Sequence, residues 1–370
     1  MSVKKVSLES LKKSLNKQFG DVAKTGDDIP KNVEIICSTG SYSLDVILDC
    51  NGIPKSRTIQ LLGPESGGKT LMSLIMMSMV QKVGGTCAFV DLEGTYTQKW
   101  ANNLGVDTEN LIYIKPKNGG ETFDIILQLV ENNIDFVILD SIAVLMTTAE
   151  EEAESDKAMM SQIARLLSFN LKRIQNKQNQ GSTTTMCYIN QLRVNNMSGY
   201  GNPESGTGGK ALKFYSSIIM DVRRKEHIGD KENPDGFSTK IKVLKNKCGK
   251  PFREVIVDLY IGPERFGIDK AGEIFNVACQ LGIIEKQSKD KENDCYVKDE
   301  KGSYYAYKTE RFYGLPKIMK YIESNPAEMD VIKKEVERIM DEKFKPAKGS
   351  FKDKVNKGQE EEEFVEEENS

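Results

Sequence analysis

The segment Gly63-Pro64-Glu65-Ser66-Gly67-Gly68-Lys69-Thr70 has the residue types and spacing of a phosphate-binding loop. Its glycines let backbone N–H groups close around phosphate oxygens, and a helix starting there adds the positive end of its dipole. Lys69 is then expected to reach the β- and γ-phosphates, and the Thr70 hydroxyl to bind Mg²⁺. The expected cofactors are therefore ATP and Mg²⁺.

Two acids follow apolar runs that are typical of buried strands. Asp140 ends the run Phe136–Asp140, where a P-loop ATPase needs a carboxylate for the magnesium ion. Glu93 follows the run Cys87–Leu92 and can polarise the attacking water, although its spacing alone also fits a helix-capping or surface acid. The predicted metal-binding residues are therefore Thr70 and Asp140.

Composition excludes several other classes of site. The seven cysteines are widely spaced and form no CxxC pair, which argues against a disulfide framework and a zinc site. The single histidine, His227, argues against a histidine-dependent triad. There is no run of eighteen apolar residues, and the N-terminal lysines are followed by no apolar stretch, so we expect a cytoplasmic protein with no membrane partner.

Charge is distributed unevenly along the chain. The net charge is −3, but residues 358–370 contain seven glutamates and no base, so the rest of the chain carries +4. A lysine-rich stretch from Lys343 to Lys357 comes just before them. Adjacent blocks of opposite sign predict a disordered tail at 345–370. Such a tail either only solubilises the protein or competes with phosphates for its basic surface.

The remaining chain predicts an α/β fold with a mostly parallel sheet and helices on both faces. Strand-like runs occupy Thr58–Leu62, Cys87–Leu92, Leu111–Lys115, Phe136–Asp140 and Thr184–Asn190, with helical stretches near 69–82, 121–132 and 157–178. Three more runs, Ser216–Val222, Thr239–Lys245 and Glu254–Leu259, lack long helices between them and indicate an antiparallel extension.

Four regions are predicted. Leu8, Leu11, Leu15 and Phe19 recur at helical spacing behind Ser7, which predicts an amphipathic docking helix. The predicted regions are an N-terminal oligomerisation helix and linker at 1–33, an ATPase core at 34–267, a small α/β domain at 268–344 and the tail at 345–370.

Several segments together resemble the RecA family of recombinases. They are KQFG at 17–20, STGSYSLD at 38–45, GPESGGKT at 63–70, FVILDS at 136–141, YINQLR at 188–193, GNPESGTGGKALKFYSS at 201–217 and VLKNK at 243–247. The resemblance implies a RecA-like P-loop core and a DNA-dependent ATPase. Such an enzyme assembles as a filament on single-stranded DNA, pairs it with a homologous duplex and exchanges strands.

The resemblance also implies roles for single residues around the nucleotide. Glu93 would be the general base, and Gln191 the sensor that links the γ-phosphate to the following DNA-binding loop. Trp100 would stack on adenine, although an ordinary half-exposed aromatic also fits. Lys245 and Lys247 would reach the γ-phosphate held by a neighbouring subunit. Strand alternation places these two lysines on one side, which also fits a solvated sheet edge.

DNA-binding residues are implied in two places. Ser161 and Arg165 lie one helical step apart, where they could touch a backbone phosphate. The segment Leu192 to Gly209 resembles the second DNA-binding loop of the family, with Arg193, Tyr200, Gly208 and Gly209 at matching positions. A flexible glycine-rich loop without a ligand is the plain alternative.

The chain departs from the family pattern at three points. The first DNA loop, 149–158, is shorter and strongly acidic, which weakens the case for base intercalation there. Gly94 stands where the family has a histidine, and the segment 286–308 is longer and more charged than expected. This divergence favours a phage-encoded or otherwise distant relative.

Three other functions remain open from the sequence. A hexameric P-loop DNA helicase or motor would form rings instead of filaments. A small-molecule kinase would need an acceptor pocket and no glycine-rich loop after Gln191. A DNA-binding regulator without turnover would not need Lys69, Thr70, Glu93 and Asp140, all of which are present.

Overall fold

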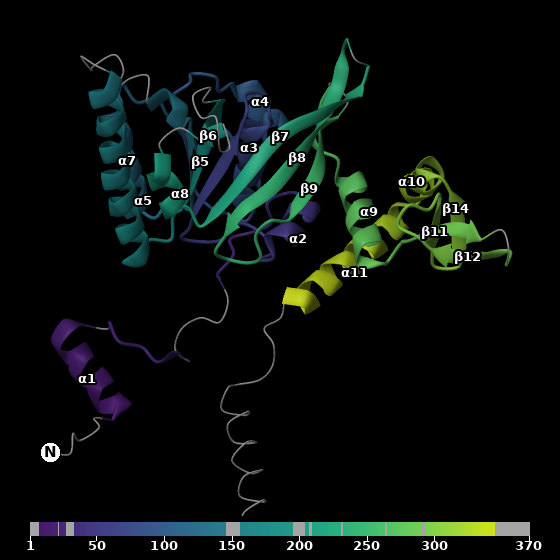
Figure 1. The fold of residues 1–370 in the computed structure, drawn as a ribbon, viewed down its shortest axis with the longest axis horizontal. Helices are drawn as coiled ribbons and strands as arrows, with labels where there is room; N and C mark the ends of the chain where they lie inside the picture. The colour runs from purple at the N-terminus through teal and green to yellow at the C-terminus, as the bar shows by residue number, and fades with distance from the viewer. Residues whose placement is uncertain are drawn as a thin grey trace, which may run out of the picture. The chain divides into compact units, whose positions relative to one another are not determined.

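The computed structural model describes residues 7–20, 22–26, 33–145, 156–194, 204–206, 209–230, 232–262, 265–290 and 293–344. Residues 34–342 form one compact unit, and 1–33 group with 343–370 in a second one. The strands of the described part all lie in the first unit (Figure 1). No helix among the described residues is long and apolar enough to cross a membrane.

The centre of this unit is a parallel sheet. Its strands follow the order β1-β5-β4-β2-β3, with bounds β1 Thr58–Gly63, β2 Cys87–Asp91, β3 Leu111–Ile114, β4 Phe136–Asp140 and β5 Thr185–Val194. Every residue of β2 and β4 is buried, because helices cover both faces of the sheet. The predicted α/β class is therefore confirmed.

Helices on the two faces build two apolar cores. Helix α2 (Tyr42–Leu48) and helix α3 (Lys69–Lys82) contribute to one core, together with Phe136 and Ile138 of β4. Helices α5 (Gly119–Glu131) and α7 (Asp156–Asn179) contribute to the other, together with Val137 and Leu139. Successive residues of β4 thus point to opposite faces, as strand geometry requires.

An antiparallel extension continues the sheet beyond β1. Strand β7 (Ile218–Gly229) pairs with β1 in parallel and with β8 (Pro234–Asn246) in antiparallel, and β9 (Glu254–Ile261) and β10 (Phe266–Ile268) follow. The expected strands were too short, because β7 continues past Val222 to Gly229 and β8 begins at Pro234 instead of Thr239, forming the long hairpin seen in Figure 1. A further short strand, β6 (Glu204–Gly206), pairs with β5.

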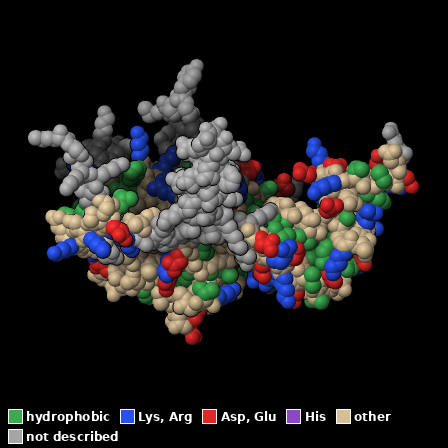
Figure 2. All heavy atoms as spheres, turned by 90° about the horizontal axis from the view of Figure 1, so that it is seen from below, with side chains coloured by type: hydrophobic (Ala, Val, Ile, Leu, Met, Phe, Trp, Pro, Cys, Tyr) green, Lys and Arg blue, Asp and Glu red, His purple; other side chains and the backbone are tan. Residues whose placement is uncertain are grey.

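The C-terminal part of the unit is a small antiparallel sheet with helices. Its strand order is β12-β11-β13-β14, and helices α9 to α11 accompany it. The bounds are α9 Lys270–Leu281, β11 Glu285–Asp290, β12 Cys295–Lys298, β13 Tyr304–Tyr307, β14 Glu310–Tyr313, α10 Leu315–Ser324 and α11 Pro326–Phe344. The long charged segment 286–308 therefore forms most of three strands. On the face in Figure 2, basic and acidic side chains are interspersed.

A buried acid joins this part to the core. Glu273 of α9 accepts hydrogen bonds from Ser41 Oγ at 2.7 Å and from the Ser43 backbone N–H at 3.0 Å, at the start of α2. Burial raises the pKa of Glu273 to about 7, although both hydrogen bonds act in the other direction. The domain boundary at residue 267 stays a prediction.

The N-terminal helix α1 spans Leu8–Phe19, as its spacing predicts. Ser7 caps it, because the Ser7 side chain accepts a hydrogen bond from the Ser10 backbone N–H at 3.3 Å. No residue of α1 is buried, and the side chains of Leu8 and Phe19 are 85% and 59% exposed. This apolar exposure is what a docking helix requires, and its role in oligomerisation stays a prediction.

Candidate nucleotide site

The phosphate-binding loop lies between the end of β1 at Gly63 and the start of α3 at Lys69. Its glycines are required by the neighbouring strand β7. A Cβ atom at Gly63 would lie 2.1 Å from the Val222 carbonyl oxygen, and one at Gly67 would lie 2.6 Å from it. Gly68 has a φ of 96°, which favours glycine. The loop is thus packed directly against the sheet extension.

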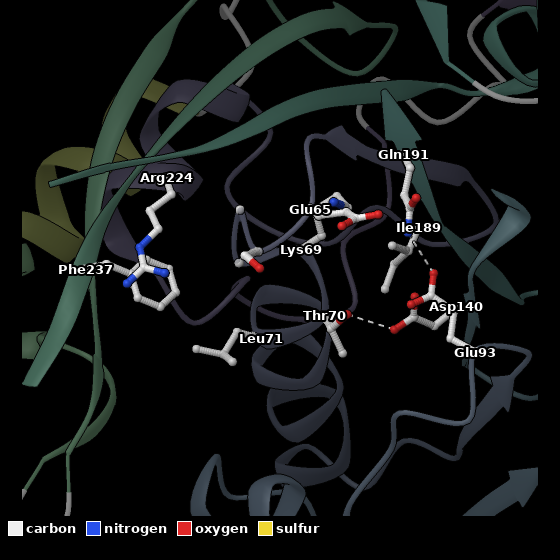
Figure 3. Close-up of a pocket in the computed structure, with 13 residues that line it drawn as sticks. Glu65, Lys69, Thr70, Leu71, Glu93, Asp140, Ile189, Gln191, Arg224 and Phe237 are labelled. Atoms are coloured by element: carbon white, nitrogen blue, oxygen red, sulfur yellow. Dashed lines mark hydrogen bonds between the residues drawn. The ribbon is translucent and has the colours of Figure 1, made fainter. Parts of the chain in front are cut away.

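A hollow of about 510 Å³ opens above this loop (Figure 3). Its lining residues are Glu65, Ser66, Gly67, Gly68, Lys69, Thr70, Leu71, Glu93, Asp140, Ile189, Gln191, Arg224 and Phe237. The carboxyl ends of parallel strands converge here, where α/β sheets bind ligands. The structure therefore brings Lys69, Thr70, Glu93, Asp140 and Gln191 into one site.

Lys69 is folded back over its own loop. Its Nζ donates to the carbonyl oxygens of Gly63 at 3.1 Å and Pro64 at 2.6 Å. Burial lowers the pKa of Lys69, while the nearby charges of Asp140 and Glu93 act in the opposite direction. An incoming phosphate would therefore offer a buried ammonium group a stronger partner than these carbonyls.

Thr70 and Asp140 face one another at the base of the hollow. Thr70 Oγ1 donates to Asp140 Oδ2 at 2.8 Å, and Asp140 is 1% exposed. Burial raises the pKa of Asp140 to about 7, and the charges of Glu93 and Asp91 add to this effect. A hydroxyl and a carboxylate oxygen fit Mg²⁺, which is usually held by one or two carboxylates plus substrate phosphates.

Glu93 is held at the edge of the hollow by two donors. Its Oε1 accepts a hydrogen bond from Gln191 Nε2 at 3.1 Å and another from Ser141 Oγ. Gln191 belongs to β5, and the antiparallel β5–β6 pairing begins at Leu192. The candidate base therefore touches the strand that leads directly into residues 195–203.

Comparison with known proteins agrees with this geometry. A family model described as the RecA N-terminal domain matches residues 5–265. Protein RecA of Acinetobacter baylyi is 36% identical over 345 residues, covering 92% of each chain. Protein RecA of Rickettsia massiliae and that of Rickettsia prowazekii are each 38% identical over 339 residues, 91% of this chain and 92% of theirs. The chain belongs to the RecA family. Membership implies a nucleotide-binding, DNA-binding protein that assembles into filaments.

Trp100, matched to the RecA-family adenine contact, lies outside the hollow. It belongs to helix α4 (Gln98–Asn103) and is 40% exposed. Its ring packs edge-on against Phe266, with 5.1 Å between the ring centroids. A role in adenine stacking therefore remains a prediction.

The paired lysines do not both lie on a strand, which corrects the prediction of simple alternation. Strand β8 ends at Asn246, so Lys247 lies just beyond it. Lys245 Nζ donates to the carbonyl oxygens of Lys213 at 2.7 Å and Phe214 at 3.1 Å, in the last turn of helix α8 (Gly209–Tyr215). Burial lowers the pKa of Lys245, and the charges of Lys247 and Lys213 lower it further. Neither lysine lines the hollow of its own chain.

The predicted DNA contacts are only partly within the described structure. Ser161 and Arg165 both lie in α7, and Arg165 is exposed. The backbone of Arg193 belongs to β5, and Gly209 begins α8. The side chains of Ser161 and Arg193 lie outside the described residues, as do Tyr200 and Gly208.

Four lining residues of the hollow were not predicted from the sequence, namely Leu71, Ile189, Arg224 and Phe237. Arg224 and Phe237 come from the parts of β7 and β8 that extend past the expected strands. Ser141 was also missed as a partner of Glu93, although it ends the matched segment FVILDS. The motif could have indicated Ser141, whereas Arg224 stands in a charged run with no apolar alternation.

Proposed function

We propose that the chain is an ATP-dependent DNA recombinase that assembles on single-stranded DNA, pairs it with a homologous duplex and exchanges strands. The observation that supports this best is the hydrogen bond between Gln191 and Glu93 inside the P-loop hollow. It places the candidate catalytic base in contact with the strand that leads to the candidate DNA loop. A cytoplasmic location is part of the proposal.

In this proposal each residue of the hollow has a distinct task. Lys69 balances charge on the β- and γ-phosphates, and Glu93 accepts the proton of the attacking water. Thr70 and Asp140 hold Mg²⁺, which when bound neutralises charge on the phosphate oxygens. Backbone N–H groups of the loop from Gly63 to Gly68 bind the phosphates. Lys245 and Lys247 act on the nucleotide of the neighbouring subunit.

DNA is held through its backbone, and base pairing between strands supplies the choice of sequence. The proposed contacts are Ser161 and Arg165 on α7, together with Arg193, Tyr200, Gly208 and Gly209 around the loop after β5. Backbone contacts of this type position DNA without reading its sequence.

A strand-exchange assay tests the proposal directly. The full chain is mixed with ATP, Mg²⁺, a labelled single strand and either a homologous or a heterologous duplex. We expect strand transfer only with the homologous duplex and only with ATP. ATP-dependent unwinding that needs no homologous strand would instead indicate a ring-forming motor.

A further inference from the structure

The hollow has two chemically different ends. Figure 3 shows Glu93, Asp140 and Gln191 on one side, Arg224 and Phe237 on the other, and the P-loop between them. A general base must lie beside the atom that it activates, so the carboxylate end faces the γ-phosphate. The opposite end then faces the part of the phosphate chain nearer the nucleoside.

Arg224 is held at this second end by an aromatic ring and a histidine. Its guanidinium carbon lies 4.3 Å from the centroid of the Phe237 ring, a cation–π contact. Its Nη2 lies 3.0 Å from His227 Nδ1. Because arginine has no acceptor, the histidine nitrogen must accept this hydrogen bond. The guanidinium is thereby held in one orientation.

Arg224 has an N–H donor that makes no hydrogen bond within the described structure. Its Nε is buried and has no hydrogen-bond partner, and no described carboxylate lies within ion-pair distance of it. The adjacent Arg223 differs, because its Nε pairs with Asp221 Oδ2 at 2.9 Å. Stacking occupies only the face of a guanidinium, so its edge N–H groups stay available to an anion. Arg224 is half-buried, and a cation whose Nε–H is buried without an acceptor favours the binding of such an anion.

The stacked pair of Arg224 and Phe237 is held against the phosphate-binding loop. Thr239 Oγ1 donates to the Gly67 carbonyl oxygen at 3.4 Å. A Cβ atom at Gly68 would lie 3.3 Å from Phe237 Cε2, so the ring packs closely on the loop. The Arg224–Phe237 pair is thus positioned by the same backbone that positions the loop, which favours preorganised binding.

We propose that Arg224, stacked on Phe237, is a further nucleotide-binding residue that contacts the α- and β-phosphates. This inference rests on the proposed ATP site and adds to it a residue from the antiparallel hairpin. ATP and ADP share these phosphates, so Arg224 contributes to the affinity for both nucleotides. It retains the product as well as the substrate, and acts on binding more than on the chemical step.

ADP titration of the full chain by calorimetry tests the assignment. In Arg224→Gln, ADP and ATP affinity should each fall about tenfold, as expected for loss of a charge-assisted hydrogen bond. The KM for ATP should rise by more than kcat falls. Arg223→Gln, on the neighbouring residue, should bind ADP like the parent chain. Unchanged ADP affinity in Arg224→Gln, or a loss confined to kcat, would overturn the proposal.

Two further variants keep the test decisive. Arg224→Lys retains the charge without the fork of donors, so its ADP affinity should fall between those of Arg224→Gln and the parent. If Arg224→Gln does not fold, parent-like affinity in Arg224→Lys overturns the proposal. Lys69→Ala tests the site itself: if it binds ADP normally, the proposed ATP site fails. If Lys69→Ala loses binding but Arg224→Gln does not, only the Arg224 assignment fails.

Discussion

Gln191 Nε2 donates a hydrogen bond to Glu93 Oε1 at 3.1 Å, although the two residues are far apart in the chain. Glu93 follows β2, and Gln191 lies on β5 where this strand begins to pair with β6. A movement of the β5–β6 pair that shifts Gln191 must therefore change the hydrogen bonding of Glu93. In the proposed function, this contact is the physical route by which DNA acts on the hydrolysis step.

Replacing Gln191 should uncouple hydrolysis from DNA. In Gln191→Ala, ATP should still bind and be hydrolysed slowly. Added single-stranded DNA should no longer raise the rate of hydrolysis, because Glu93 has lost its hydrogen bond to β5. ATP turnover with and without DNA measures this. Gln180→Ala, an exposed position outside the site, is the control. Full DNA stimulation in Gln191→Ala would remove Gln191 from its proposed role.

Substitutions at Lys69 and at Glu93 should impair ATP hydrolysis in different ways. Lys69→Ala should abolish hydrolysis, because the charge on the β- and γ-phosphates is no longer balanced. Glu93→Gln should keep ATP and DNA bound while turnover falls by about 10² to 10⁴, the usual cost of losing a general base. Nucleotide binding and turnover are measured on both proteins. Near-normal turnover in Glu93→Gln would show that another group acts as the base.

Asp140 should make the nucleotide-free protein less stable as pH rises. Its folded-state pKa is raised from 3.8 to about 7, because burial disfavours the charged form. A raised folded-state pKa gives stability that is full below pH 3.8 and lost as pH rises through 7. Asp140→Asn should therefore unfold at a higher temperature than the parent at pH 8, with a smaller difference at pH 5. An equal difference at both pH values would contradict this.

Ligand binding at the same residue should have the opposite pH dependence. Mg²⁺ requires the ionised carboxylate, so magnesium-dependent ATP binding should strengthen as pH rises from 6 to 8. Part of the pH dependence of stability should survive in Asp140→Asn, because burial also raises the pKa of Asp45 to about 6.

The two lysines at the end of β8, Lys245 and Lys247, should act between subunits. Lys245→Ala and Lys247→Ala should bind ATP through an intact P-loop yet lose DNA-stimulated turnover, since a trans cation can contribute 10³ to 10⁵ in rate. Mixing either protein with Lys69→Ala protein joins one subunit's P-loop to the other's lysines. Turnover in the mixture should exceed the sum of the two proteins alone. No excess despite co-assembly would exclude action in trans.

The acidic tail, which lies outside the described residues, should restrain duplex binding. Deleting Gly358–Ser370 removes seven negative charges that compete with DNA phosphates, so duplex affinity should rise. The gain should shrink with salt, because the Debye length is about 10 Å at 0.1 M. A full-length tail with glutamine for each glutamate should match the deletion. Identical salt titrations for all three proteins would leave the tail as a solubiliser.

Local patterns were sufficient to predict the parallel core. The run Phe136–Asp140 and the helix 69–82 have the observed bounds, because burial on both faces requires continuous apolar residues and a phosphate loop sets where the helix starts. The sequence did not predict the end of β7 after Val222 or the start of β8 before Thr239. Residues such as Arg223 and Arg224 show no alternation, and their strand is stabilised by cross-strand pairing that the sequence does not display.

In the candidate site too, residues of local motifs were predicted, whereas residues brought in by the tertiary fold were not. Motif residues such as Lys69 and Asp140 were found because their chemistry fixes their spacing. Arg224 was missed because the long hairpin brings it into the site, and the contact of Lys245 with α8 depends on two elements that meet only in the fold.

The most direct test of the proposed function is ATP hydrolysis by the full chain. The rate is measured with and without single-stranded DNA, and the same samples are imaged by electron microscopy. We expect slow turnover alone, a marked rise when single-stranded DNA is added, and helical filaments in the samples that contain ATP and DNA. Turnover that is indifferent to DNA, or closed rings in place of filaments, would contradict the proposal.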